Sequence, residues 1–293
     1  LTCCSIWLMA EQQQPLTIAS WLRQQGSLAR LELEIALCHA LDCSRAHLLS
    51  HPEQQLTCRE LKQLGHWTHQ LRNHVPLAYL TGEQEFWGLC LSVDERVLVP
   101  RPDTEILVEC ALECLPDAAA STQARALQAL DLGTGSGAIA LAIAQERRDV
   151  VMHACDNSAE CLAVAETNSR ALGLPISLHL SDWFQRVDQR FHIIVANPPY
   201  IDSEDPHLSL LQAEPQGALV APDHGLGDLQ AIVERAPAHL YRGGWLLLEH
   251  GYDQGMATRE LLTNRGFEQV RTRRDLGGNE RVSWGRLPVN EAD

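Results

Sequence analysis

A glycine-rich segment near the middle of the chain has the residue types of a nucleotide-binding loop. Gly133-Thr134-Gly135-Ser136-Gly137 follows Asp131 and an apolar run that predicts a strand, and it precedes a segment of helical character. Glycines allow a tight turn and a close backbone approach to a ligand, and a following helix offers free N–H groups at its start. Asp156 comes at the end of the next predicted strand, where a carboxylate can accept hydrogen bonds from both hydroxyls of a ribose. We therefore expect this region to bind a ligand that contains adenosine.

Two adenosine cofactors fit the glycine segment. Gly133, Gly135 and Ala138 also match the dinucleotide pattern G-x-G-x-x-G/A, which is typical of NAD-binding proteins. The denser Gly-x-Gly-x-Gly spacing, with Asp131 just before it, favours S-adenosylmethionine. The loop by itself leaves both cofactors open.

A second motif, Asn197-Pro198-Pro199-Tyr200, follows the apolar run 193–196. It would lie at the carboxyl end of a buried strand, the edge at which doubly wound sheets bind ligands. A planar NH₂ group, in an amide or on adenine, is a poor nucleophile because its lone pair is delocalised, and it has two N–H donors. The Asn197 side-chain oxygen can accept one of them and the Pro198 carbonyl the other. Proline stiffens this arm, and Tyr200 offers a flat face to a planar group.

This arrangement suits the transfer of a methyl group from a sulfonium to nitrogen. Fixing both hydrogens aligns the nitrogen with the methyl carbon, and ideal orientation contributes on the order of 7–11 kcal/mol. No general base is obligatory, because the nitrogen becomes acidic as its bond to carbon forms. A hydride-transfer enzyme has no use for such a motif, so it favours S-adenosylmethionine over NAD. Asn197, Pro198 and Tyr200 are the predicted catalytic residues.

From residue 127 onward the hydrophobic pattern alternates between strand and helix, which predicts an α/β domain with helices on both faces of a sheet. The predicted strands are 127–132, 150–155, 176–180, 191–196, 244–249, 267–273 and 281–286. The predicted helices are 138–147, 158–172, 228–242 and 253–265. Both motifs would then follow strands of one sheet.

The chain before this domain has a different composition. Residues 1–75 hold six basic and six acidic side chains, so the formal charge of −15 belongs entirely to residues 76–293. Residues 15–76 show apolar positions three and four apart and predict a small helical bundle. Ser44 and Thr57 are predicted N-caps, with Thr57 and Glu60 forming a capping box, and Gly65 and Pro76 are predicted helix ends.

The remaining segments complete the predicted domain organisation. Residues 77–100 predict a β-hairpin connector whose strands, 86–89 and 93–99, flank a turn at 94–96. A catalytic domain is predicted over 101–289, beginning with a helix that ends near Leu115 and a surface loop over 116–125. We expect residues 1–14 to be a disordered or non-native extension, and no stretch has the length of a membrane span.

Composition excludes several classes of function. With 38 acidic against 23 basic residues, the chain lacks the excess of positive charge through which proteins bind nucleic acids independently of sequence. Lys62 is the single lysine, so Schiff-base chemistry would rest on one residue. The ten cysteines include no C-x-x-C pair, which predicts no metal site and mostly buried, reduced thiols in a cytoplasmic protein.

The two motifs and their flanking segments resemble the bacterial release factor glutamine methyltransferases, the PrmC/HemK family. The flanking matches are the segments 76–88, 99–105, 181–184, 197–201 and 247–251. The resemblance spans about residues 15–286. It implies a Rossmann-like class I methyltransferase fold, with a seven-stranded mixed sheet and an N-terminal helical domain for substrate recognition. It also implies methylation of the side-chain amide of the glutamine in the Gly-Gly-Gln motif of class I peptide chain release factors.

The same resemblance implies roles for individual residues. The S-adenosylmethionine contacts implied are Gly133, Thr134, Gly135, Ser136, Gly137, Asp156, Trp183 and Asn197. We expect Trp183 to pack beside the adenine and Asp182 to accept a hydrogen bond from its amino group. The residues expected to bind the target glutamine are Asn197, Pro198, Pro199 and Tyr200, with Arg101 and Glu105 from a segment near the site.

One segment departs from the family pattern. After the second motif the family tends to carry Arg-aromatic-Glu-Pro, whereas this chain has Gln212-Ala213-Glu214-Pro215. The missing arginine removes any ion pair that it makes, and we expect Glu214 to orient a loop on the substrate side.

Three other functions compete with this hypothesis. An amino-methyltransferase acting on adenine or guanine would share the second motif, but the acidic charge argues against it. A non-catalytic adapter for release factors would not need both motifs intact, and an NAD dehydrogenase would need a hydride-site acid or base that we do not find. We therefore predict a monomeric cytoplasmic methyltransferase with no direct contact to nucleic acid or membrane.

Overall fold

The computed structural model describes residues 15–116 and 126–289. The segment 1–14 and most of the predicted surface loop, 117–125, lie outside the described residues, as do residues 290–293. The chain divides into two compact units, residues 1–81 and 82–293, and each is described by itself. None of the described helices is long and apolar enough to span a membrane.

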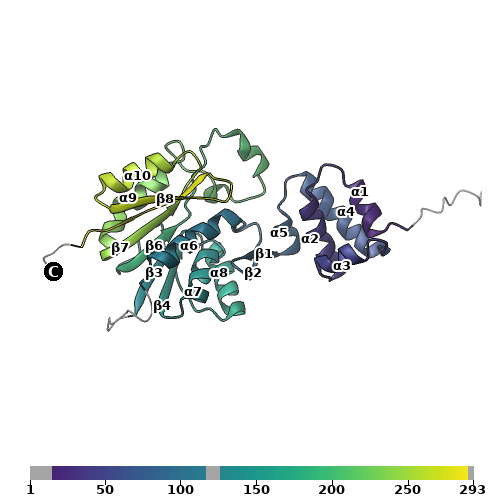
Figure 1. Ribbon diagram of the computed structural model, residues 1–293, viewed down its shortest axis with the longest axis horizontal. Helices are drawn as coiled ribbons and strands as arrows, with labels where there is room; N and C mark the ends of the chain where they lie inside the picture. The colour runs from purple at the N-terminus through teal and green to yellow at the C-terminus, as the bar shows by residue number, and fades with distance from the viewer. Residues whose placement is uncertain (1–14, 117–125, 290–293) are drawn as a thin grey trace, which may run out of the picture. The chain divides into compact units, whose positions relative to one another are not determined.

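The first unit is helical, as its hydrophobic pattern predicts (Figure 1). Its helices are α1 (Ile18–Gln24), α2 (Arg30–Leu41), α3 (Arg45–Ser50), α4 (Cys58–Arg72) and α5 (Leu77–Thr81). Ser44 caps α3, and the predicted capping box of Thr57 and Glu60 opens α4. Helices α1, α2 and α4 enclose an apolar core that includes Trp21, Leu37 and Leu64.

The predicted helix end at Gly65 is wrong. Helix α4 continues through Gly65 to Arg72, and no atom lies within 4 Å of the position that a Cβ would occupy there. A glycine in an exposed helix costs roughly 1 kcal/mol relative to alanine, which the buried Leu64, Trp67 and Leu71 outweigh.

The second unit opens with a hairpin whose turn differs from the predicted one. Strand β1 (Glu83–Phe86) pairs antiparallel with β2 (Leu89–Ser92), so the turn is Trp87-Gly88. Both turn residues have positive φ, 54° and 71°, as a two-residue hairpin turn requires. The predicted turn at 94–96 does exist, with Asp94 accepting the Arg96 N–H, but it lies beyond the hairpin. The sequence did not indicate this turn, because tryptophan is not a residue that is typical of turns.

A seven-stranded mixed sheet forms the centre of the second unit, as predicted (Figure 1). Its strands are β3 (Leu127–Leu132), β4 (Val150–Asp156), β5 (Ser177–Leu180), β6 (Phe191–Ala196), β7 (Leu240–Glu249), β8 (Glu268–Arg274) and β9 (Glu280–Arg286). Their order is β5-β4-β3-β6-β7-β9-β8, with β9 antiparallel to both of its neighbours and the other pairs parallel. The chain reverses its direction across the sheet between β3 and β6, so a ligand crevice is expected at their carboxyl ends.

Helices cover both faces of this sheet. They are α6 (Glu105–Cys114), preceded by the short helix η1 (Pro102–Thr104), then α7 (Ala138–Glu146), α8 (Ala159–Leu172), α9 (Gly227–His239) and α10 (Gly255–Asn264). Leu130, Ile194 and Leu246 pack with apolar residues of α9 and α10 in one core. Alternate residues of the same strands point to the opposite face, which α6 and α7 cover. The loop between β6 and α9 contains the short helices η2 (Pro206–Leu210) and η3 (Gln216–Ala218).

Two smaller predictions need correction. Helix α9 ends at His239 and β7 begins at Leu240, earlier than predicted, because Leu240 pairs with Phe191 at the start of β6. The described cysteines are free, but Cys58 and Cys90 are exposed, so the thiols are less buried than predicted.

Candidate active site

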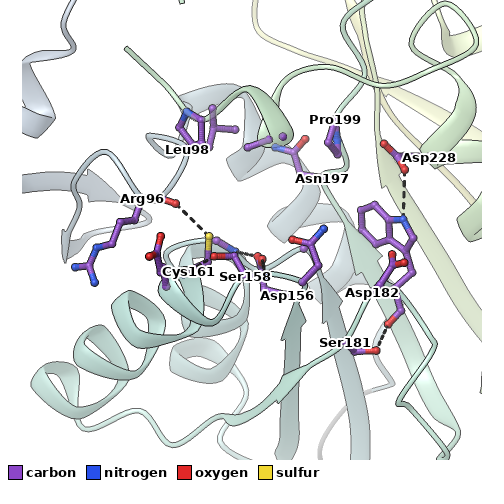
Figure 2. Close-up of a pocket in the computed structure, with 18 of the residues that line it drawn as sticks. Arg96, Leu98, Asp156, Ser158, Cys161, Ser181, Asp182, Asn197, Pro199 and Asp228 are labelled. Atoms are coloured by element: carbon purple, nitrogen blue, oxygen red, sulfur yellow. Dashed lines mark hydrogen bonds between the residues drawn. The ribbon is translucent and has the colours of Figure 1, made fainter. Parts of the chain in front are cut away.

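A pocket of about 690 Å³ opens at the carboxyl ends of β3, β4 and β6 (Figure 2). Its wall brings together six of the predicted cofactor residues: Gly133, Gly135, Asp156, Asp182, Trp183 and Asn197. Pro199 of the second motif also lines it. The pocket has the size of a site for a small ligand or cofactor.

The glycine loop turns sharply between β3 and α7. Gly133, Gly135 and Gly137 have φ values of 70°, 53° and 86°, a region that favours glycine. A Cβ at Gly133 would lie 3.3 Å from the Trp183 ring, so this glycine also lets the indole approach the loop. A Cβ at Gly137 would lie 3.2 Å from Leu141 Cδ1, which shows how closely the loop packs on the helix that follows.

Asp131 supports the loop from below. Its side chain is fully buried, and the Thr134 hydroxyl donates a hydrogen bond of 2.6 Å to Oδ2. Oδ1 has no partner in the described parts of the chain. Burial raises the pKa of Asp131 to about 7. Thr134 and Asp131 therefore hold the glycine loop in shape, and neither residue lines the pocket.

Asp156, at the end of β4, lies directly across from the glycine loop. Its Oδ2 accepts the Gly135 N–H at 2.9 Å and its Oδ1 accepts the Ser158 N–H at 2.9 Å. The carboxylate is thus oriented by two main-chain donors, and each oxygen has acceptor capacity left for a ligand hydroxyl. This geometry fits the predicted contact with a ribose.

Trp183 forms another wall of the pocket. It has a φ of 45°, which is unusual for a bulky residue, and its indole Nε1 donates to Asp228 Oδ1 at 3.3 Å. The hydrogen bond to Asp228 is drawn as a dashed line in Figure 2. The Ser181 hydroxyl donates to the Trp183 carbonyl at 2.8 Å and holds its backbone. Positive φ at a large side chain costs on the order of 1–3 kcal/mol, a strain found mainly at functional sites.

The second motif begins where β6 ends. The Asn197 Nδ2 donates to the Thr104 hydroxyl at 3.2 Å, so the side-chain oxygen Oδ1 is the group left for a ligand. The Tyr200 hydroxyl donates to Glu249 Oε1 at 3.4 Å, and the Tyr200 carbonyl accepts from Gln254 Nε2 at 3.0 Å. Burial raises the pKa of Tyr200 above its usual value, so the hydroxyl keeps its proton.

The residues predicted near the substrate make contacts within the protein. Arg101 forms an ion pair with the buried Glu214, which also accepts the Val99 N–H at 3.3 Å. Glu214 thus has a cation partner although Gln212 stands where the family tends to carry arginine, and it ties its loop to the segment before α6. Glu105 accepts the Trp87 N–H at 2.8 Å and holds the hairpin turn. Neither Arg101 nor Glu105 lines the pocket.

Sequence reasoning missed several residues of this region, among them Asp228, Thr104 and Glu249. Asp228 lines the pocket and holds Trp183, while Thr104 and Glu249 lie behind the second motif. Asp228 lies at the start of α9, far in sequence from both motifs, and no local sequence pattern marks it as a site residue. Thr104 and Glu249 did lie within family-like segments, but their types alone gave no reason to link them to Asn197. Within the described residues, no group of three His, Cys, Asp or Glu side chains could hold a metal ion.

Comparison with known proteins now defines the class. A Methyltransferase small domain model matches residues 106–218, and a PrmC N-terminal domain model matches residues 17–82. The solved structure of a methyltransferase from Pyrococcus furiosus has a TM-score of 0.52 at 18% identity, over 77% of this chain and 99% of that one. The second unit therefore has the class I methyltransferase fold.

The particular family follows from sequence relatives. A release factor glutamine methyltransferase from Pseudomonas aeruginosa is 48% identical over 88% of this chain and 92% of its own length. Another of the same name from Escherichia coli is 43% identical over 91% of this chain and 97% of its own length. The chain belongs to the family of release factor glutamine methyltransferases.

Proposed function

We propose that this chain transfers a methyl group from S-adenosylmethionine to the side-chain amide nitrogen of the glutamine in the Gly-Gly-Gln motif of class I release factors. The main support for this proposal is the position of Asn197. Its amide nitrogen is engaged by Thr104, so its oxygen is left as an acceptor on the wall of the pocket that also holds Asp156 and the glycine loop. Membership of the family supports the same reaction.

The residues present fit S-adenosylmethionine. Asp156 has acceptor capacity left for ribose hydroxyls, and the Trp183 indole supplies a flat apolar wall beside Gly133. Asp182 is exposed at the pocket wall and is the proposed acceptor for the adenine amino group. When bound, S-adenosylmethionine supplies the electrophilic methyl carbon. These residues bind and orient it, and they take no part in bond making.

The second motif prepares the nucleophile. Asn197 Oδ1 and the Pro198 carbonyl would accept the two N–H groups of the target amide, which directs the nitrogen toward the methyl carbon. Tyr200 would pack its ring against the planar amide. On attack at the methyl carbon, the amide nitrogen would become more acidic and would release its proton to water, with the sulfonium losing its methyl group as the neutral thioether. Each of these groups therefore acts by orientation.

The first unit is the proposed recognition module for the release factor. Its PrmC N-terminal domain match and its neutral charge set it apart from the acidic second unit. We expect the enzyme to work as a monomer in the cytoplasm, where release factors act. We expect no direct contact with nucleic acid, because the net charge of −15 opposes phosphate binding.

The test is methyl transfer from labelled S-adenosylmethionine to a purified, unmodified class I release factor. Parallel reactions contain a release factor with Gly-Gly-Gln changed to Gly-Gly-Ala, bulk DNA or bulk RNA. Label on the normal release factor that is absent from the Gly-Gly-Ala variant supports the proposal. Label only on nucleic acid would establish a base amino-methyltransferase instead. Cofactor binding without label on any of them would favour an adapter.

A further inference from the structure

Asn197 can act as an acceptor for the substrate only if its side-chain amide has one of two orientations. A rotation by 180° would exchange the oxygen for the NH₂ group with little change of shape. The NH₂ group would then face the NH₂ of the target glutamine, donor against donor. Something in the fold must therefore select the orientation with Nδ2 turned toward Thr104.

Thr104 alone cannot select it. Thr104 is 4% exposed and lies at the end of η1, and its hydroxyl accepts the Asn197 Nδ2–H at 3.2 Å. A hydroxyl can both donate and accept, so it would satisfy either end of the Asn197 amide. The choice depends on where the hydroxyl sends its own proton.

Glu249 is the group that can decide this. It ends β7, next to β6, and its side chain is 1% exposed. It accepts the Tyr200 hydroxyl at 3.4 Å. Burial raises the pKa of Glu249 to about 7, although hydrogen bonding from Thr104 opposes this rise, so the carboxyl is ionised above about pH 7. An ionised carboxylate only accepts hydrogen bonds. Above about pH 7 the Thr104 proton is therefore drawn toward Glu249, and the Thr104 oxygen is left to accept from Asn197.

The surrounding charges are compatible with this role. Arg281 favours the ionised form of Glu249, whereas Asp103 opposes it. Tyr200 and Thr104 present hydroxyl donors to the carboxylate. A buried carboxylate with one oxygen, Oε2, unpartnered among the described residues is costly, and its retention behind the motif needs a reason.

We propose that Thr104 and Glu249 are positioning residues that fix the Asn197 amide with its oxygen toward the substrate. Neither residue touches the substrate in the proposed arrangement, and both act through Asn197. The proposal rests on the proposed function, because it gives the reason why the Asn197 oxygen must face the target amide.

The first experiment compares Thr104→Val with Thr104→Ser in methyl transfer to a release factor. Valine keeps the shape but removes the acceptor, so kcat should fall roughly tenfold, the effect of one lost buried hydrogen bond. KM for the release factor and the dissociation constant of S-adenosylmethionine should stay within about twofold. Serine keeps the hydroxyl and should restore most of the rate. Thr68→Val, at a buried threonine of the first unit that bonds the Gly65 carbonyl, is the matched control and should leave kcat unchanged.

Glu249→Gln tests whether the Glu249 carboxylate directs the Thr104 hydroxyl. A glutamine amide can donate to Thr104 as well as accept from it, so the selection is lost and kcat should fall several-fold. Glu113→Gln, at an exposed carboxylate paired with Arg273, is the matched control. Full kcat in Thr104→Val, or equal losses in the valine and serine variants, would overturn the proposal.

A spectroscopic measurement separates this proposal from the proposed function, since it needs no methyl acceptor. The Asn197 side-chain amide signals in a ¹H–¹⁵N spectrum are identified as those missing from Asn197→Ala. They should shift in Thr104→Val and Glu249→Gln but keep their position in Thr104→Ser. Unmoved signals in both of the first two variants would refute the orientation mechanism, whichever substrate the enzyme methylates.

Discussion

The two sides of the pocket are built from different kinds of contact. On the cofactor side, Asp156 is oriented by two main-chain N–H groups, and the glycine loop takes its shape from positive φ angles. On the amide side, Asn197 is oriented by Thr104, which comes from a segment 93 residues away, and Glu249 lies behind them. On the first side the donors to Asp156 are main-chain groups within 21 residues of it, whereas the second side depends on side chains from segments much farther apart in the sequence.

This difference predicts that the two sides can be damaged separately. Changes on the cofactor side should appear mainly in the affinity for S-adenosylmethionine. Changes on the amide side should appear mainly in turnover. Single substitutions on each side of the pocket test this separation.

Asn197→Ala should reduce kcat by about a hundredfold or more, because it removes the acceptor that orients the target amide. The affinity for S-adenosylmethionine should change much less, since Asp156 and the glycine loop remain. Single-turnover kinetics and calorimetric titration with the cofactor measure the two quantities. A variant with near-normal turnover would remove Asn197 from its proposed role.

Asp156→Ala should have the opposite signature. Loss of the charged acceptor should weaken S-adenosylmethionine binding by roughly 1.5–3 kcal/mol, with kcat at saturating cofactor less affected. The Gly135 and Ser158 N–H groups also lose their acceptor, so circular dichroism should check that the loop region still folds. An unchanged dissociation constant would argue against the ribose contact.

Glu249→Gln should change how stability depends on pH. Burial raises the pKa of Glu249 to about 7 in the folded protein, so between its ordinary value and about 7 the folded state holds a proton that the unfolded chain has released. Stability therefore falls as the pH rises through this window. Relative to the glutamine variant, the wild type should lose about 1–3 kcal/mol of unfolding free energy between about pH 5 and about pH 8.

Denaturant titrations at several pH values measure this effect. Glu113→Gln serves as the control, because the Arg273 guanidinium lowers the pKa of Glu113 and the sign of its contribution is reversed. Parallel pH profiles for wild type and Glu249→Gln would show that the carboxyl does not titrate in this range.

Asp228→Ala should give the smallest effect. It removes the acceptor of the Trp183 indole, so the ring loses one hydrogen bond while its backbone stays held by Ser181. We expect S-adenosylmethionine binding to weaken by about 0.5–1.5 kcal/mol, with kcat unchanged. A larger loss of turnover than of cofactor affinity would show that Asp228 helps to orient the target amide and not the cofactor.

The sequence by itself determined the features that depend on near neighbours. Strand and helix alternation from residue 127, the capping box at Thr57 and the glycine loop all follow from residue type and short spacing, and the structure has each of them. The second motif could be interpreted chemically because its donors and acceptors lie in four consecutive residues. These signals are local, so they do not require knowledge of the fold.

Only the tertiary structure decided the contacts between distant segments. The hairpin turn at Trp87-Gly88 is held by Glu105, and the Glu214 loop is tied to Arg101. Thr104 reaches Asn197 only because η1 and the end of β6 meet at one edge of the sheet. Such pairs leave no periodicity or spacing in the chain, since their geometry comes from the packing of helices on strands. That packing gives the Asn197 side chain its hydrogen-bond partner, Thr104, and it places the buried Glu249 beside Tyr200 of the same motif.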